Sequence, residues 1–478
     1  MQNIITDVVV IGGGGAGLPA ALAAIESGAN VILLEKRFVT GGDASLAGGD
    51  VFSVESHLHK DAGITLNKDD IYKRALEYHR YDRVNPQILH AFINKSADTI
   101  RWLEEQGLEF EIVDNCTRLK SSLAAPVVRF SLATRTLTRI FKEKGGQVYL
   151  RTRCKQVLCG ADGRISGVRA ATRDGKEFDI QTRSVILCSG SFVGNKELLK
   201  KYFPYHYDEI YTTDALLSNT GDGISMAAEA GAALEDFCTL VKEPNYSFET
   251  TLDSPNRISF ERSSIWVNKK GQRYLAEDSN GVAIVNTLIQ QPGKIGFALY
   301  DEKIMQNITK IGTSQQGRLP RPSEKVLDAK QYLQKEAGNW DEIARWIGCD
   351  PGVLKATIAE YNSFCIRGHD DNFAKQPQYM ISLDTPPFYA VKFQPLIVET
   401  AGPIRVNEHM EVLNKQDKCV PGLYAAGVVV SGWISYDHGP FDLMRGSELG
   451  FAINSGRIAG ESAGKFVQGN PNMGGRQS

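Results

Sequence analysis

The chain has 478 residues, of which 42% are hydrophobic and 23% charged, and its formal net charge is −2. These values are typical of a globular protein larger than one hydrophobic core usually serves, so two domains or one domain with an insertion are expected. The near-neutral charge gives no basic footprint for nucleic acid or anionic lipid, and no apolar run approaches the roughly 20 residues of a membrane span.

The eight cysteines are scattered, and the sequence has no C-x-x-C pair and no histidine cluster at metal-ligand spacing. Iron–sulfur, zinc and c-type haem sites are therefore not expected, and no metal is predicted. The sequence begins almost directly with a strand and shows no signal-peptide pattern. We expect a cytoplasmic protein with free thiols.

Residues 7–36, DVVVIGGGGAGLPAALAAIESGANVILLEK, predict a strand, a glycine turn, a helix and a second strand. In the G-x-G-x-x-G turn, Gly12 lets the chain reverse, Gly14 lets backbone N–H groups approach a pyrophosphate, and Gly17 lets helix and strand touch. Glu35 ends the second strand, 23 residues after Gly12 (35 − 12), where a carboxylate can bind a ribose 2′-OH. The unit predicts a dinucleotide site at the positive end of the helix.

Two further segments precede the middle of the chain. Residues 39–50, VTGGDASLAGGD, form a glycine-rich loop that suits close approach of the backbone to a planar ligand. Residues 86–107 carry apolar side chains at three- and four-residue spacing and end in glycine. This spacing predicts an amphipathic helix.

Residues 147–190 change to the alternating pattern of short strands. Asp162-Gly163 and Asp174-Gly175 are typical hairpin turns between such strands. We therefore expect a three-stranded antiparallel element laid against a parallel sheet.

Residues 241–380 are less regular and richer in Asn, Gln and Pro, with helical stretches at 339–348 and 351–364. We interpret this segment as an inserted α+β domain. Strand character then returns at 388–413, and a buried apolar strand ends in glycine at 423–427.

A small-residue-rich helix is expected at 446–466. The predicted fold is α/β, with a Rossmann-like domain made from residues 1–240 and 381–478 around the inserted domain.

Seven blocks of sequence, in order, resemble the flavoprotein family that contains fumarate reductase flavoprotein subunits, L-aspartate oxidase, urocanate reductase and 3-ketosteroid dehydrogenases. The blocks are the glycine unit with Glu35, VTGGDASLAGGD, VILCSGSFVGN (185–195), NTGDGISMA (219–227), WVNKKGQRYLAED (266–278), PFYAVKFQPLIVETAG (387–402), and PGLYAAG followed by GSELGFAINSGRIAGE. The resemblance implies FAD held extended across the Rossmann-like domain, and it implies that the inserted domain caps the isoalloxazine.

The resemblance also implies particular cofactor contacts. The residues facing the pyrophosphate would be Gly12, Gly14, Gly15, Ala16 and Gly17. Those at the adenosine end would be Glu35 and Lys36, and those along the flavin edge Asp43, Ser45, Gly48 and Gly49. Those at the ribityl and pyrimidine ends would be Asp222, Gly427, Ser447, Glu448 and Leu449. No histidine lies in residues 39–50, where covalent-flavin members have theirs, so non-covalent FAD is expected.

The sequence departs from the fumarate reductases at the proton donor. In those enzymes, the arginine that donates the proton follows the block matched by residues 266–278. The corresponding position of this chain is occupied by Gly281. The segment 428–445 is about five residues longer than its counterpart, and Val428 stands where many members have an acid. These differences disfavour fumarate as the substrate.

The longer segment supplies three candidate catalytic residues. Tyr436 is a candidate base, as in ketosteroid dehydrogenases, and His438 titrates near neutrality and is a second candidate. Arg445 is positioned to bind a carboxylate or carbonyl oxygen and to stabilise an enolate. The structural alternatives are packing of Tyr436 with Trp433 and Phe441, a turn cap by His438, and an ion pair between Arg445 and Glu448.

The resulting prediction is an FAD-dependent oxidoreductase that acts on a Cα–Cβ bond beside a ketone or carboxylate, with hydride transfer at flavin N5. We favour a dehydrogenase or ene-reductase of a cyclic or enone-type small molecule, served by a separate electron donor or acceptor. The alternatives are a fumarate-reductase-like dicarboxylate enzyme, an amino-acid oxidase of L-aspartate oxidase type, and a non-catalytic electron carrier. The oligomeric state is not predicted.

Overall fold

The computed structural model describes residues 4–82, 84–113, 115–120, 130–204, 216–236, 238–245, 262–279, 281–307, 334–434 and 444–469. The chain divides into two compact units. The first unit comprises Met1–Tyr205, Asp214–Val241 and Glu399–Ser478, and the second comprises His206–Thr213 and Lys242–Val398. The sequence interpretation ends the insertion at 380, whereas the second unit continues to 398. It does so because residues 388–393 pair with a strand of that unit.

A six-stranded sheet forms the centre of the first unit. Its strands, in spatial order, are β16 (Glu411–Leu413), β17 (Cys419–Ala425), β10 (Ser184–Leu187), β2 (Val8–Ile11), β3 (Val31–Glu35) and β6 (Gln147–Leu150). All pairs are parallel except β16 with β17. Strands β2, β3 and β10 are buried along their whole length, as their continuous apolar sequences predict for parallel strands covered on both faces.

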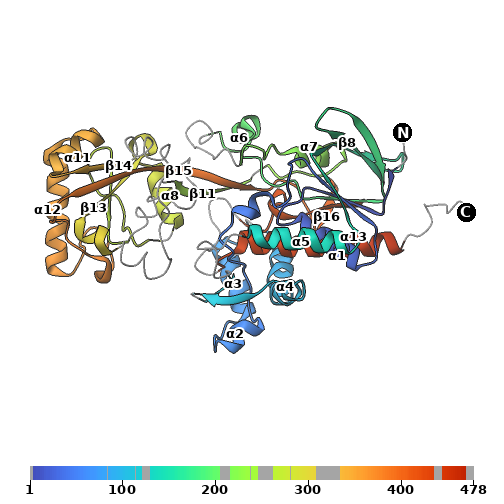
Figure 1. Cartoon of the computed structure of the whole chain (residues 1–478), viewed down its shortest axis with the longest axis horizontal. Helices are drawn as coiled ribbons and strands as arrows, with labels where there is room; N and C mark the ends of the chain where they lie inside the picture. The colour runs from blue at the N-terminus through green and yellow to red at the C-terminus, as the bar shows by residue number, and fades with distance from the viewer. Residues whose placement is uncertain are drawn as a thin grey trace, which may run out of the picture. The chain divides into compact units, whose positions relative to one another are not determined.

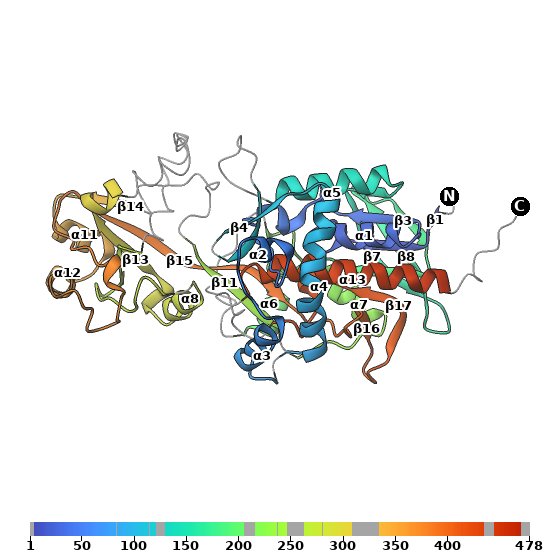
Figure 2. The same cartoon turned by 90° about the horizontal axis from the view of Figure 1, so that it is seen from below.

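Four helices of the first unit pack together beside this sheet (Figures 1 and 2). They are α1 (Gly17–Glu26), α4 (Pro86–Glu105), α5 (Ser131–Glu143) and α13 (Ser447–Gly469). Helices α1 and α13 pack closely because glycines face the neighbouring backbone. A Cβ at Gly456 would lie 2.2 Å from the Ala16 carbonyl oxygen, and one at Gly460 would lie 2.2 Å from that of Ala20.

A second sheet of this unit has the order β1 (Ile4–Ile5), β9 (Glu177–Gln181), β8 (Ile165–Thr172) and β7 (Thr152–Cys159). Strands β7, β8 and β9 are antiparallel, as expected. The prediction of three strands is incomplete, because Ile4 and Ile5 add a parallel strand on β9. Two residues directly before a strong strand carry too little pattern to be recognised.

The remaining elements of the first unit are short. They are η1 (Gly42–Leu46), α2 (His57–Asp61), α3 (Lys68–Tyr78), β4 (Phe110–Val113), β5 (Cys116–Leu119), α6 (Lys196–Tyr202), α7 (Asp222–Glu229) and η6 (Gly427–Val429). No helix in the described ranges combines the length and the apolar character needed to cross a membrane.

The second unit contains a sheet of β11 (Thr239–Asn245), β15 (Phe388–Ala401), β13 (Gly296–Asp301) and β12 (Ile265–Asn268), with β14 (Gln334–Ala337) also paired to β15. Its helical elements are α8 (Gly281–Ile289), η4 (Pro292–Lys294), α11 (Trp340–Ile347), α12 (Pro351–Arg367) and η5 (Pro377–Tyr379). The α+β composition expected for the insertion is therefore present.

Buried charges lie beneath α12 and form what we call the ion cluster: Arg273, Glu277, Asp370 and Lys375. Arg273 Nη2 lies 3.0 Å from Glu277 Oε2 and 2.9 Å from Asp370 Oδ2. Lys375 Nζ lies 3.1 Å from Glu277 Oε2 and donates to the Ser264 carbonyl oxygen at 2.7 Å. The side chains of Glu277 and Lys375 are both 0% exposed, so this charge balance is internal to the second unit.

Candidate cofactor site

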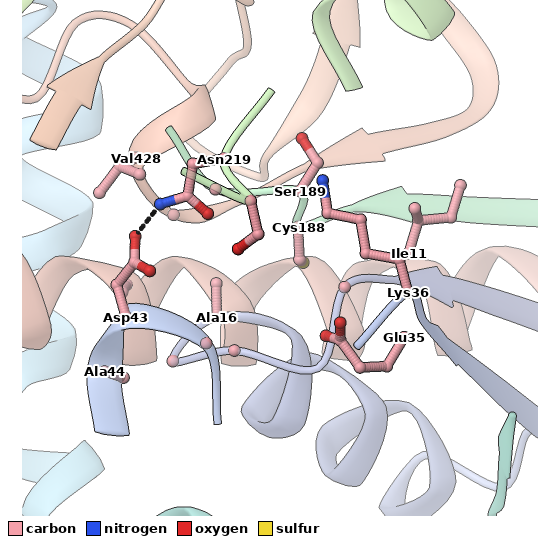
Figure 3. A pocket seen from close by; sticks show the side chains of 18 of the residues that line it. Ile11, Ala16, Glu35, Lys36, Asp43, Ala44, Cys188, Ser189, Asn219 and Val428 are labelled. Carbon is pink, nitrogen blue, oxygen red and sulfur yellow. Dashed lines mark hydrogen bonds between the residues drawn. The ribbon is translucent and has the colours of Figure 1, made fainter. Parts of the chain in front are cut away.

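An elongated cavity crosses the first unit at the carboxyl ends of β2, β3 and β10. It encloses an empty volume of about 1110 Å³, including the part open to solvent. Figure 3 shows Glu35 and Lys36 on one side, Asp43, Asn219 and Val428 on the other, and Ala16 between them. This is the place where open α/β sheets bind ligands, outside the carboxyl ends of the strands.

The glycine turn lies between β2 and α1, and its three glycines have different surroundings. Gly12 has φ +101°, and a Cβ on Gly17 would lie 1.7 Å from the Gly12 carbonyl oxygen. These two glycines are therefore required by the fold itself. A Cβ on Gly14 would have no neighbour closer than 3.8 Å, and Gly14 lines the cavity. The space above Gly14 is thus left for a ligand.

Glu35 ends β3 and is 5% exposed. Its Oε2 accepts a hydrogen bond from the backbone N–H of Gly13 at 2.9 Å, and its Oε1 accepts one from that of Arg37 at 2.7 Å. A carboxylate has further lone pairs for a ligand hydroxyl. The side chain therefore fixes the glycine turn and still lines the cavity.

Asp222 begins α7 on the same side of the cavity as Lys36. Lys36 Nζ lies 3.1 Å from Asp222 Oδ2, and Arg153 Nη2 lies 2.6 Å from Oδ1. Burial raises the pKa of the Asp222 carboxyl, but the two cations and the hydrogen bond from Thr220 outweigh burial and hold it below its ordinary value. Asp222 is therefore an anion that orders two basic side chains at the cavity wall.

Asp43 lies in η1 on the opposite side, and its Oδ2 accepts a hydrogen bond of 2.5 Å from Asn219 Nδ2. Its Oδ1 is buried and has no hydrogen-bond partner among the described residues. Burial raises the pKa of this carboxyl to about 6. The hydroxyls of Ser189 and Ser218 also line the cavity, buried and without a partner in the described ranges.

Most of the residues predicted to contact the cofactor line this one cavity. They are Gly12, Gly14, Gly15, Ala16, Glu35, Lys36, Asp43, Asp222, Gly427, Glu448 and Leu449. The other five, which are not among its lining residues, are Gly17, Ser45, Gly48, Gly49 and Ser447. Gly17 packs against the turn, and Ser45 Oγ donates to the Gly42 carbonyl oxygen at 2.7 Å. Gly48 is exposed.

Several lining residues were not predicted. They include Arg37, Arg153, Cys188, Ser189, Asn219 and Glu399. Asn219 directly precedes the Thr220-Gly221-Asp222 block, so its neighbourhood was recognisable. Arg153 comes from β7, where the sequence shows only strand alternation and gives no signal for a ligand.

The catalytic candidates are not brought together by the described residues. Tyr436 and His438 lie outside them. Arg445 Nε donates to Asp50 Oδ2 at 2.8 Å, instead of forming the ion pair with Glu448 that we considered. Asp50 also binds Arg118 through both carboxylate oxygens.

Trp433 has a stacking partner among the described residues, whereas the packing with Tyr436 and Phe441 that we considered lies outside them. Its ring stacks on Phe451, with ring centroids 4.4 Å apart and an interplanar angle of 6°. Phe451 therefore occupies one face of the Trp433 indole ring, and this face is not left for packing with Tyr436. Phe451 belongs to α13, so the contact fixes the residues before 435 on that helix.

A glycine turn at the amino end of a helix, an acid ending the next parallel strand and an elongated cavity define a dinucleotide-binding α/β protein. The model of the FAD binding domain family matches residues 7–439, and the chain belongs to this family. It is an FAD-dependent oxidoreductase, and the resemblance found in the sequence is confirmed.

The similarity to known proteins extends over nearly the whole chain. Vinyl phenol reductase of Lactiplantibacillus plantarum is 28% identical over 488 residues, which cover 96% of this chain and 97% of the reductase. NADH:fumarate oxidoreductase of Klebsiella pneumoniae is 27% identical over 475 residues. The match covers 97% of this chain but 48% of that longer protein. The solved structure of 3-ketosteroid delta1-dehydrogenase from Sterolibacterium denitrificans has the same fold, with a TM-score of 0.78 at 18% identity over 96% of this chain and 99% of that one.

The cavity fits FAD on three observations. It leaves room over Gly14, where a pyrophosphate needs close backbone approach. It is elongated, with polar groups at both ends (Figure 3). It also gathers buried polar atoms of Asp43, Ser189 and Ser218 that have no partner among the described residues, and such atoms are rare in folded proteins.

The first expected result concerns Glu35. If Glu35 binds the adenosine ribose, as the resemblance implies, Glu35→Ala should weaken FAD binding by about 1–3 kcal/mol, because it removes charge-assisted hydrogen bonds. It should also lower the free energy of unfolding of the FAD-free protein by about 1 kcal/mol, because the N–H groups of Gly13 and Arg37 lose their acceptor. Fluorescence titration with FAD and urea unfolding measure the two effects separately. Unchanged FAD affinity would contradict the ribose assignment.

Proposed function

We propose that this oxidoreductase transfers a hydride between flavin N5 and a carbon of a C–C bond beside a ketone or another conjugating group. Vinyl phenol and fumarate, the compounds in the names of two relatives, both contain a carbon–carbon double bond. Bound FAD would supply the two-electron chemistry, and the residues that line the cavity would hold it. Electrons come from, or go to, a separate donor or acceptor.

The observation that carries the choice of substrate class is the Arg445–Asp50 pair. An arginine that clamps a dicarboxylate needs its positive charge directed at the substrate, but Arg445 Nε already donates to Asp50 Oδ2 at 2.8 Å. Val428, which is 8% exposed, lines the same side of the cavity as Asp43 and brings no charge. An enone-type or vinyl phenol-type molecule suits this environment better than a dicarboxylate.

Proton transfer at the neighbouring carbon needs one acid or base. We assign this role to Tyr436, with His438 as the alternative. Arg445, the third candidate of the sequence, donates to Asp50, and we do not assign it to the substrate oxygen. Comparing Tyr436→Phe with His438→Gln discriminates between the first two. The variant that loses turnover while it keeps FAD identifies the residue that moves the proton.

The substrate class is tested with FAD-loaded protein and reduced methyl viologen under anaerobic conditions. Oxidation of the dye is followed with vinyl phenols, cyclic enones and fumarate as separate acceptors. We expect turnover with the first two classes. Efficient turnover of fumarate would favour the dicarboxylate alternative, and hydrogen peroxide formed from an amino acid in air would favour the amino-acid oxidase alternative.

The second expected result concerns attachment of the cofactor. We propose that FAD is held without a covalent bond, because residues 39–50 contain no histidine. Acid precipitation of the yellow protein should therefore release all FAD into the supernatant. Flavin fluorescence that stays with the polypeptide on a denaturing gel would contradict non-covalent binding.

A further inference from the structure

The carboxyl group of Asp43 lines the cavity with one oxygen anchored and the other incompletely bonded in the described structure. Its Oδ2 is held by Asn219 Nδ2 at 2.5 Å, and Asn219 is 8% exposed. Its Oδ1 is buried with no hydrogen-bond partner among the described residues. Figure 3 shows the two side chains joined by this hydrogen bond, on the side of the cavity away from Glu35.

The position of Asp43 relative to Glu35 decides which part of FAD it meets. If the adenosine ribose lies at Glu35 and the pyrophosphate at Gly14, the flavin lies on the side of Asp43, Asn219 and Val428. The inference that follows therefore rests on the proposed placement of FAD. Reduced flavin that carries a negative charge is a strong hydrogen-bond acceptor, and a protonated carboxyl group is able to donate to it.

We infer that Asp43 takes up one proton from solvent whenever the bound flavin is reduced, and returns it when the flavin is oxidised. Two electrons and one proton delivered as a hydride leave one negative charge on the flavin. That charge beside Asp43 disfavours a second anion, so the carboxylate binds a proton. Counted together, the flavin and Asp43 take up two electrons and two protons, and the hydride donor loses two electrons and one proton.

The charges around Asp43 agree with this exchange. Burial raises the pKa of Asp43 to about 6 in the protein without FAD, which places this carboxyl close to its titration near neutral pH. Arg37 and Lys36 oppose the rise, and Glu35 adds to it. The remaining charged side chains that line the cavity are Asp222 of α7, Glu448 of α13, Arg153 of β7 and Glu399 of β15, and the uncharged polar or titratable ones are Thr152, Cys154, Cys188, Ser189, Ser218 and Asn219.

The experiment is a potentiometric titration of FAD-loaded protein between pH 5 and 8 with redox dyes and no organic substrate. Each proton taken up per two electrons changes the midpoint potential by about 30 mV per pH unit. Above about pH 6 the slope of the unaltered protein should be twice that of Asp43→Asn, which keeps an acceptor for Asn219 but cannot titrate. Asp384→Asn, at an exposed acid of the second unit that is ionised throughout this range and does not line the cavity, is the control and should keep the steeper slope.

Equal slopes in the unaltered protein and in Asp43→Asn would overturn the inference. If Asp43→Asn does not fold or does not hold FAD, proton uptake by the unaltered protein is measured with an indicator dye in weak buffer at pH 7. Two protons per two electrons, with the absorbance of anionic reduced flavin, supports the inference, and one proton overturns it. Protein that takes up no FAD would overturn the proposed function and this inference together. Failure to turn over enones would contradict the substrate proposal alone.

Discussion

Gly17→Ala is expected to prevent stable folding of the first unit, whereas Gly14→Ala is expected to fold and to lose FAD. A Cβ at Gly17 would lie 1.7 Å from the Gly12 carbonyl oxygen, so α1 has to move, at a cost of about 3 kcal/mol or more. A Cβ at Gly14 has 3.8 Å to its nearest neighbour, and the free energy of unfolding should change by no more than about 1 kcal/mol. Its methyl group instead occupies the place of the pyrophosphate.

The two glycine variants serve as controls for each other, because they differ by three positions in one turn. Circular dichroism and urea unfolding in the absence of FAD measure folding, and fluorescence titration measures the FAD dissociation constant. For Gly14→Ala we expect the dissociation constant to rise at least tenfold, or about 1.4 kcal/mol. An unchanged constant would show that no ligand backbone passes over Gly14.

Glu277→Ala is expected to lower the free energy of unfolding of the second unit by about 3–5 kcal/mol. It removes the anion that separates two fully or nearly fully buried cations, Arg273 and Lys375, whose side chains are 5% and 0% exposed. It also removes the acceptor of the Trp266 backbone N–H at 2.9 Å. Urea unfolding followed by tryptophan fluorescence measures the loss.

The control for this variant lies in the same unit. Asp384→Ala breaks the Lys303–Asp384 pair at 2.6 Å, but the Asp384 side chain is 55% exposed. Solvent screens such a pair, so the loss should stay below about 1 kcal/mol. Equal losses for the two variants would contradict the internal role of the ion cluster.

The pH dependence of stability gives a second check on Glu277. Burial raises the pKa of its carboxyl, but Lys375 and Arg273 outweigh burial and hold it below the ordinary value of 4.5. A lowered pKa means that the stabilisation is complete above pH 4.5 and is lost as the pH falls through the value in the folded protein. Glu277→Gln should remove this part of the acid dependence.

The sequence predicts those parts of the molecule whose contacts are local. The first strand, the glycine turn, α1 and β3 follow one another within 30 residues, and their pattern predicted both the fold and the acid at the end of β3. The hairpins of β7, β8 and β9 were equally recognisable in the sequence, because their Asp-Gly turns connect neighbouring strands. Helices α4, α11, α12 and α13 were found from their periodicity.

The charged and hydrogen-bonded pairs described above join residues that are far apart in the sequence, and sequence spacing does not reveal them. Asp43 and Asn219 are 176 residues apart, and Arg153 and Asp222 are 69 apart. Arg445 and Asp50 are 395 apart, so the sequence offered Glu448, three positions away, as the nearest acid. The strand order β10-β2-β3 brings the segments after β3 and β10, which contain Asp43 and Asn219, to one edge of the sheet, whereas the other two pairs involve residues outside this sheet.

The close packing of Gly456 and Gly460 against Ala16 and Ala20 joins the last described helix to the first one. A nascent chain emerging from the ribosome therefore exposes its glycine turn long before the partner of α1 has been synthesised. The packing partner of α1 is complete only after residues 447–469 have been synthesised. Premature termination anywhere upstream of residue 447 would leave a polypeptide without this helix, and such a product should be removed by proteases as an incompletely folded species.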